Sequence, residues 1–274
     1  MSGNTIKKIV IGLSVIGFSQ GIYAAEGKTT IQVEHNFKTQ DRRHNDSFKL
    51  IHKTPSLWQY EVKFGTSSGG GKNYDVAWDD MKGGSGGLVI QKDFKMPIKG
   101  NTLTPSFEVS FGSTSVNYQS GIKYSYSINK EWSVYGRYRY EIKKLARSER
   151  YKTISSTDKF GYAGEQYRAK SDTARNRFDT GVTWNGIPNI SLGYVFNYYV
   201  GDNLNESSSY SKGIFTPNQY AVYNGKKTDY EHQFKIQYRY QQWRPYLEVD
   251  DVSVSSSSKS RQGKVKIGVN YQFN

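Results

Sequence analysis

The chain has 274 residues, enough for one large domain or two small ones, and its formal net charge is +14. Only 35% of the residues are hydrophobic, 15% are aromatic, and Cys is absent. These values exclude a disulfide framework, and the lack of an apolar stretch of about 20 residues after the N-terminus excludes a helical membrane protein. A transmembrane β-barrel stays compatible with them, because only alternate residues of its strands face lipid.

The first 25 residues have the pattern of a secretory signal peptide. Lys7 and Lys8 precede the apolar run IVIGLSVIGF (9–18), and small residues end the segment SQGIYAA (19–25). We therefore expect residues 1–24 to be a signal peptide and residues 25–274 to form the exported domain. The alternative is a short buried strand.

Twelve short segments of alternating polarity follow. They occupy residues 30–37, 47–53, 57–64, 86–93, 104–111, 116–128, 132–141, 175–184, 190–199, 229–240, 243–253 and 262–273. Most have the length that a tilted strand needs to cross the apolar part of a bilayer. The predicted fold is all-β, a transmembrane up-and-down antiparallel β-barrel of 12 strands.

The connections between these segments differ in length. Tight turns such as 54–56 and 185–189 alternate with longer polar loops, of which 142–174 is the longest. Barrels of the outer-membrane type have short periplasmic turns and long outer loops. Two connections break this alternation, because 94–103 is long for a turn and 112–115 is short for an outer loop.

The last segment indicates how the protein is assembled. Val265, Ile267, Val269, Tyr271 and Phe273 share one face of it, and polar residues or Gly occupy the other. An alternating strand that ends in an aromatic residue is the signal expected by the barrel-assembly machinery, although here one further residue, an Asn, follows. Outer-membrane lipid is the second partner that this strand implies.

The segment WSVYGRYRY (132–140) decides which side of the wall is polar. Trp132, Val134, Gly136, Tyr138 and Tyr140 alternate with a second set that contains two arginines. An Arg that faced lipid at the bilayer midplane would cost about 2–4 kcal/mol. Because the side-chain period of a strand is two, the aromatic set must face lipid and the arginines must face the lumen.

The same parity argument, applied to every segment, gives candidate substrate-binding residues on the lumen side. They are Tyr135, Arg137, Arg139, Arg175, Arg177, Lys235, Arg239, Arg244, Lys264 and Lys266. An excess of basic side chains near a low-dielectric wall attracts anions and slows cations. Acidic residues including Glu141, Asp179 and Glu248 share this face, so the alternative is that the charges pair with one another and only keep the lumen wet.

Tyrosines accompany the basic residues on the lumen side. Tyr135, Tyr199 and Tyr246 have the inward parity. A tyrosine ring stacks on the apolar side of a sugar, and guanidinium groups bind carboxylates bidentately, so the combination favours an acidic sugar over an inorganic ion. The alternative is that these rings pack at the rim.

Other chemistry finds little support in the sequence. GTSSGGGKN (65–73) lacks the first Gly and the final Ser or Thr of a phosphate-binding loop. No Cys/His or HExxH spacing predicts a metal site, and the four histidines have no Ser and acid partners at an evident matching depth. We predict no catalytic residues, no metal and no cofactor, and the alternation of basic residues with aromatic ones argues against a nucleic-acid partner.

Three stretches resemble the KdgM-type oligogalacturonate-specific porin family. They are YGRYRYEIKK (135–144), HQFKIQYRYQQWRPYLEVDDVS (232–253) and GKVKIGVNYQF (263–273). The string WRPYLEV (243–249) looks like the penultimate strand of that family, and the arginine pair looks like its seventh strand. The resemblance implies a small twelve-stranded channel whose lumen carries tracks of basic side chains, along which carboxylated sugars slide; a relative in the family serves sialic acid.

The resemblance carries this role to Arg137, Arg139 and Arg244, which match by position, whereas the other candidates rest on parity. The basic loop 142–174 is expected to be either a mobile surface loop or a funnel over the mouth. We thus expect a monomeric, anion-selective porin, not an enzyme, in the outer membrane of a Gram-negative bacterium, which takes up acidic oligosaccharides passively. The alternatives are a general or structural barrel without sugar selectivity, an outer-membrane hydrolase, and a soluble exported carbohydrate-binding protein.

Overall fold

The computed structural model describes residues 27–69, 78, 81–154, 163–168, 172–202, 205–211, 214–220, 227–254 and 260–273. The predicted signal peptide, residues 1–24, lies outside the described residues, and its cleavage stays a prediction. No helix in the described part of the chain is long and apolar enough to span a membrane.

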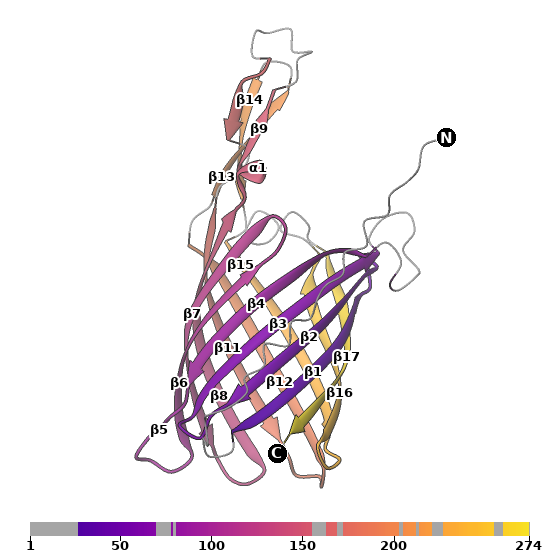
Figure 1. Ribbon diagram of the computed structural model, residues 1–274. Coiled ribbons are helices and arrows are strands. Elements are labelled where there is room, and N and C mark those ends of the chain that lie inside the picture. Colours follow the sequence, from indigo (N-terminus) through magenta and orange to yellow (C-terminus); the bar gives the residue numbers. More distant parts are fainter. Residues whose placement is uncertain are drawn as a thin grey trace, which may run out of the picture.

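Twelve long antiparallel strands form a closed barrel (Figure 1). They are β1 (Lys28–Lys38), β2 (Arg43–Lys53), β3 (Trp58–Gly69), β4 (Lys82–Lys92), β6 (Asn101–Phe111), β7 (Ser115–Ser127), β8 (Trp132–Leu145), β11 (Thr173–Trp184), β12 (Ile190–Gly201), β15 (Thr228–Tyr238), β16 (Trp243–Ser253) and β17 (Arg261–Phe273). Each pairs with the next of these strands along the chain, and β1 pairs with β17 to close the barrel. The prediction of a twelve-stranded up-and-down barrel is confirmed.

The burial pattern is the inverse of that of a soluble protein. Large apolar side chains are exposed on the outer wall, including Phe64, Phe234 and Ile267, whereas the fully buried side chains are polar, including Asp179, Asn197 and Asp250. Alternation along each strand produces this arrangement, because successive residues point to opposite faces of the wall. Exposed apolar residues of a barrel wall face lipid, and the polar ones face the lumen.

One end of the barrel carries tight turns. Leu57, Asn189 and Gln241 adopt positive φ angles of 66°, 62° and 51° in three of them, which lets the chain reverse within a few residues. The long connection 94–103 belongs to this end. Phe94 and Lys95 form a short strand, β5 (Phe94–Lys95), which pairs with the beginning of β6 and extends this hairpin beyond the barrel wall.

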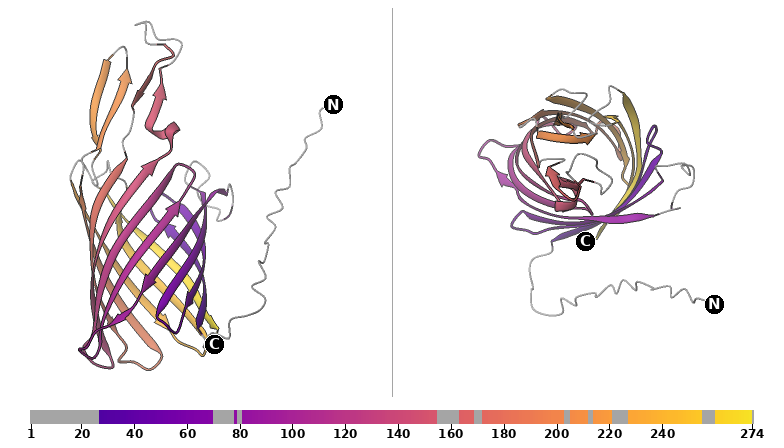
Figure 2. Two further views of the ribbon diagram at one scale, coloured as in Figure 1. Left: turned by 60° about the vertical axis from the view of Figure 1, so that its left-hand side comes forward. Right: turned by 90° about the horizontal axis from the view of Figure 1, so that it is seen from above.

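Longer structures rise from the opposite end (Figures 1 and 2). α1 (Arg147–Arg150) leads into β9 (Tyr151–Thr153), which pairs with β10 (Gln166–Arg168), and β13 (Asn205–Ser211) pairs with β14 (Ile214–Tyr220). Viewed from above, these hairpins lie within the outline of the barrel (Figure 2). The expected bounds of the loop 142–174 were therefore wrong in part, because β8 continues to Leu145 and the segment contains helical and strand structure. Its role as a funnel or as a mobile surface loop stays a prediction.

Candidate substrate channel

Four arginines and two carboxylates gather on the inner face of β8 and β11. The strands pair in a register that sets Arg137 opposite Asp179, Arg139 opposite Arg177 and Glu141 opposite Arg175. The inward parity of these residues follows from their neighbours, since Tyr138 and Phe178 on the alternate positions are exposed on the outer wall. We call the six charged residues the arginine cluster.

Asp179 is the centre of the arginine cluster. Its carboxylate accepts hydrogen bonds from Arg137 Nε at 2.7 Å, Arg139 Nη2 at 2.9 Å and Arg177 Nε at 2.6 Å, and its side chain is inaccessible to solvent. Glu141 accepts a hydrogen bond from Arg175 Nε at 2.6 Å. Four arginines against two carboxylates leave the cluster with a net charge of +2.

Amide side chains complete the contacts of these arginines. Arg177 Nη2 donates to Asn197 Oδ1 on β12 at 3.0 Å, and Arg139 Nη1 donates to Gln119 Oε1 on β7 at 3.3 Å. Asn197 is fully buried. Neither amide was among the predicted site residues, although both have the inward parity that would have identified them.

A second group of charges lies on β16 and β17. Lys264 and Lys266 contact Asp250, with Nζ to Oδ2 distances of 2.8 and 2.9 Å, and Lys266 also pairs with Glu248. Two lysines and two carboxylates make this lysine cluster neutral. The interpretation that lumen charges pair with one another is thus correct for the lysine cluster and only partly correct for the arginine cluster.

Two of the three lumen tyrosines, Tyr199 and Tyr246, do not lie as the sugar-stacking hypothesis requires, whereas Tyr135 is half-buried. Tyr199 and Tyr246 are 2% and 5% exposed, so sugars cannot reach their faces. Arg175 lies 4.3 Å from the centre of the Tyr199 ring, and Lys235 lies 3.7 Å from that of Tyr246. These rings bind the protein's own cations and orient them. Stacking of sugars on them is excluded in this conformation.

Tyr135 and Tyr246 each lie over a glycine on the neighbouring strand. A Cβ atom on Gly181 would overlap the Tyr135 ring, and one on Gly268 would lie 2.5 Å from Tyr246 Cζ. Passing over Gly268, the Tyr246 hydroxyl reaches β1, where it donates to Glu34 Oε2 at 2.5 Å. Both rings are therefore structural parts of the inner wall.

Two of the remaining candidates, Arg239 and Arg244, lie apart from both clusters, whereas Lys235 lies opposite Glu248 of the lysine cluster in the β15–β16 register. Arg244 donates to Gln272 Oε1 at 2.6 Å, and Arg239 donates to Asn185 Oδ1 at 2.8 Å near the tight turns. Lys235 has its Tyr246 contact but no carboxylate within salt-bridge distance among the described residues. Four of the predicted site residues therefore belong to the arginine cluster and two to the lysine cluster, with Lys235 beside the latter, while Arg239, Arg244 and Tyr135 lie outside both. Their role in substrate binding stays a prediction.

Two of the four histidines, His35 and His44, make a contact that the sequence did not predict. His44 belongs to β2, which begins before the expected segment 47–53, and its Nδ1 lies 3.2 Å from His35 Nε2. His35 Nδ1 in turn lies 2.9 Å from Asp46 Oδ1. In the described ranges no serine hydroxyl is hydrogen-bonded to either ring, and no group of His, Asp and Glu residues there has the geometry of a metal site.

Comparison with known proteins places this barrel in a family. The model of the oligogalacturonate-specific porin protein (KdgM) family matches residues 21–273. The chain belongs to this family. It is a porin, and family and fold together indicate an outer-membrane protein of a Gram-negative bacterium.

Two relatives span much of the chain. Uncharacterized protein YiiY of Salmonella typhimurium is 24% identical over 247 residues, which cover 89% of each chain. Oligogalacturonate-specific porin KdgM of Dickeya dadantii is 27% identical over 173 residues, which cover 63% of this chain and 60% of the relative.

Solved structures show the same fold. The NanC porin superposes with a TM-score of 0.64 at 17% identity, over 88% of this chain and 98% of that one. The KdgM porin in complex with disordered oligogalacturonate superposes with a TM-score of 0.58 at 16% identity, over 89% of this chain and 99% of that one. At these identities the likeness concerns the fold.

Proposed function

We propose that this porin conducts acidic oligosaccharides, of the oligogalacturonate type, passively and with a preference for anions. The observation that carries the proposal is the arginine cluster, in which Asp179 and Glu141 offset only two of four guanidinium charges. The uncompensated charge on a low-dielectric wall favours carboxylates over neutral sugars. Family membership supports the same substrate class.

The internal carboxylates would set the strength of each contact. An arginine that is already held by Asp179 or Glu141 offers an incoming carboxylate only part of its binding capacity, so the sugar exchanges with an existing partner. Conduction requires binding that is favourable enough for entry and weak enough for release. The pairing within the cluster therefore supports transit rather than retention.

The barrel closes within one chain, which supports a monomeric channel without chemistry. A general pore without sugar selectivity is the second candidate, and the neutral lysine cluster favours it. A hydrolase finds less support, because the His35–Asp46 pair has no nucleophilic serine bonded to it in the described ranges.

The test is single-channel recording of the refolded porin in a planar bilayer under a salt gradient, followed by addition of trigalacturonate. We expect a reversal potential of the sign for anion preference, and current block by trigalacturonate but not by a neutral trisaccharide. Stable openings without either effect would establish the general pore instead.

Two variants change the charge of the arginine cluster in opposite directions. Arg137→Gln with Arg139→Gln lowers its net charge from +2 to zero, and Asp179→Asn raises it to +3. Anion preference should fall in the first and rise in the second. The control is Lys92→Gln with Lys95→Gln, which removes the same charge at the tight-turn end. Reversal potentials that stay the same in both cluster variants would contradict this mechanism.

A further inference from the structure

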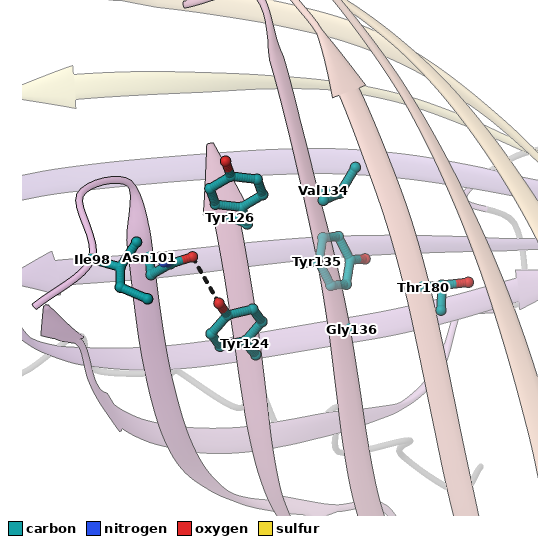
Figure 3. A pocket seen from close by; sticks show the side chains of 8 residues that line it. All are labelled: Ile98, Asn101, Tyr124, Tyr126, Val134, Tyr135, Gly136 and Thr180. Atoms are coloured by element: carbon teal, nitrogen blue, oxygen red, sulfur yellow. Dashed lines mark hydrogen bonds between the residues drawn. The ribbon is translucent and has the colours of Figure 1, made fainter. Parts of the chain in front are cut away.

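A groove on the outer wall crosses β7, β8 and β11 (Figure 3). One hollow of about 450 Å³ is lined by Ile98, Asn101, Tyr124, Tyr126, Val134 and Thr180, among others. A second hollow of about 370 Å³ shares Tyr124, Gly136 and Thr180 with it and continues to Leu103 and Phe178. Because the two hollows share residues, they form one continuous groove, which we call the outer-wall groove.

The groove exists because one glycine has no side chain, and no neighbouring side chain occupies the space above it. Gly136 lies between Tyr124 of β7 and Thr180 of β11 in the strand register, and a Cβ atom added to it would meet no atom within 4 Å. At another outward-facing glycine, Gly86, an added Cβ atom would lie 2.5 Å from the Phe111 ring, which already covers that position. The floor at Gly136 is therefore open to a molecule from outside.

The chemistry of the lining favours an apolar occupant. Tyr138 and Phe178, whose ring centroids lie 5.3 Å apart, line the second hollow, and Tyr124 and Tyr126 line the first. The Tyr124 hydroxyl already donates to Asn101 Oδ1 at 2.8 Å, as the dashed line in Figure 3 shows. A hydrocarbon chain could therefore cover these rings without breaking the hydrogen bond between Tyr124 and Asn101.

The position of the groove identifies which part of the membrane it contacts. Gly136 is four residues from Trp132, where β8 begins at the tight-turn end, which corresponds to roughly 13 Å along the strand. Trp132 and Trp184 lie 6.0 Å apart at this end and mark the membrane interface, where Trp is enriched. The groove thus lies in the half of the membrane nearer the tight turns.

Basic residues stand at the tight-turn end of the groove. The turns that carry Lys99 and Lys130 are joined by the Ser127 backbone N–H, which donates to Gly100 O at 3.0 Å. Both lysines are exposed, and neither pairs with a carboxylate of the described residues. Glu131 offsets one of the two charges, which leaves an excess of one positive charge beside the interface.

We propose that the outer-wall groove binds one anionic glycerophospholipid, with an acyl chain over Gly136 and the phosphate at Lys99 and Lys130. The apolar lining, the open floor and the basic turns together fit this ligand, whose headgroup lies at the interface while its chains extend into the bilayer. This site is independent of the transported solute, because it is on the lipid-facing side of the wall.

The test is native mass spectrometry of the intact porin, titrated in detergent with palmitoyl-oleoyl phosphatidylglycerol. The wild type should retain one lipid. Gly136→Leu fills the groove and should weaken binding about tenfold, the change expected from losing contact with roughly two methylene groups. Ala174→Leu adds the same side chain to an outward position of β11 outside the groove and should bind as the wild type does.

A second pair of substitutions tests the contact between the lipid phosphate and the two lysines. Lys99→Gln with Lys130→Gln should bring phosphatidylglycerol binding down to that of phosphatidylcholine with the same chains, while a heat-dependent gel shift confirms that each variant is folded. Equal binding by wild type and Gly136→Leu would overturn the groove as the binding site. Equal binding of the two lipids by the wild type would overturn the assignment of the phosphate to the lysines.

Discussion

Asp93 shows how a single residue makes part of the stability of the barrel depend on pH. It lies outside the barrel strands, where Lys53 Nζ contacts Oδ2 at 2.5 Å and the buried Thr104 hydroxyl donates to Oδ1 at 2.7 Å. Burial raises the pKa of this carboxyl, but the hydrogen bonds from Lys53 and Thr104, together with the positive charge of Lys53, lower the pKa by more than burial raises it. The pKa of Asp93 therefore lies below the ordinary value of 3.8. A lowered folded-state pKa stabilises the protein above about pH 4 and ceases to do so as the pH falls through it.

We therefore expect Asp93→Asn to destabilise the barrel by about 1–2 kcal/mol at pH 7, as loss of a partly buried, charge-assisted contact does. The difference between wild type and variant should shrink as the pH falls below about 4, because protonation removes the same charge from the wild type. Urea unfolding from lipid vesicles at pH 7 and pH 3 measures both quantities. A difference that stays constant between these two pH values would show that the charge of Asp93 contributes nothing.

At this scale the sequence predicted the face of each charged residue but not its partner. Parity alone placed Arg137, Arg139 and Asp179 on the lumen side, because the cost of a lipid-facing charge decides that choice. Their convergence depends on the register between β8 and β11, which are separated by a long connection. Local pattern carries no information on that register, so the contacts of Asp179 could not be predicted.

At the scale of the element, the twelve strands could be predicted because each carries its own alternation. Their ends could not, since strands such as β3 and β8 continue beyond the membrane with polar residues, where alternation of hydrophobicity ceases. The short paired strands above the barrel (β9 with β10, and β13 with β14) were not predicted for the same reason. The turn 94–103 appeared too long only because β5 extends a hairpin past the wall.

Gly268 illustrates what a strand requires beyond alternation. A side chain there would displace the Tyr246 ring and break its hydrogen bond to Glu34 across β17. We expect Gly268→Val to lower the free energy of unfolding by about 1–3 kcal/mol, the range for overpacking of a well-packed site. Urea unfolding from vesicles measures it.

Gly193→Val is the matched control for this substitution. It also faces the lumen, but its nearest neighbour, Lys235 Cβ, lies 3.9 Å from the added Cβ atom, which is an ordinary contact. Its loss of stability should be much smaller. Equal losses at the two positions would mean that the cost arises from the backbone of glycine and not from the Tyr246 ring.

For the whole molecule, closure of the sheet is what turns a sequence of low hydrophobicity into a membrane protein. Every strand of the barrel has two neighbours, and β1 with β17 removes the last free edge, so the backbone is hydrogen-bonded without water. The residues then separate into a lipid-facing wall and a charged lumen. This division was predictable, whereas the balance of paired and unpaired charge inside was not.

That balance should make ion selectivity depend on salt. The Debye length is about 10 Å at 0.1 M and about 3 Å at 1 M ionic strength, so the field of the arginine cluster extends farther into the lumen at the lower concentration. We expect the permeability ratio of anion to cation, from reversal potentials, to exceed one at 0.1 M and to approach one at 1 M. The Asp179→Asn variant has a higher net charge in the arginine cluster. Its permeability ratio should therefore be higher than that of the wild type at 0.1 M and equal to it at 1 M. A ratio that did not change with salt would assign selectivity to pore size, because steric exclusion does not depend on screening.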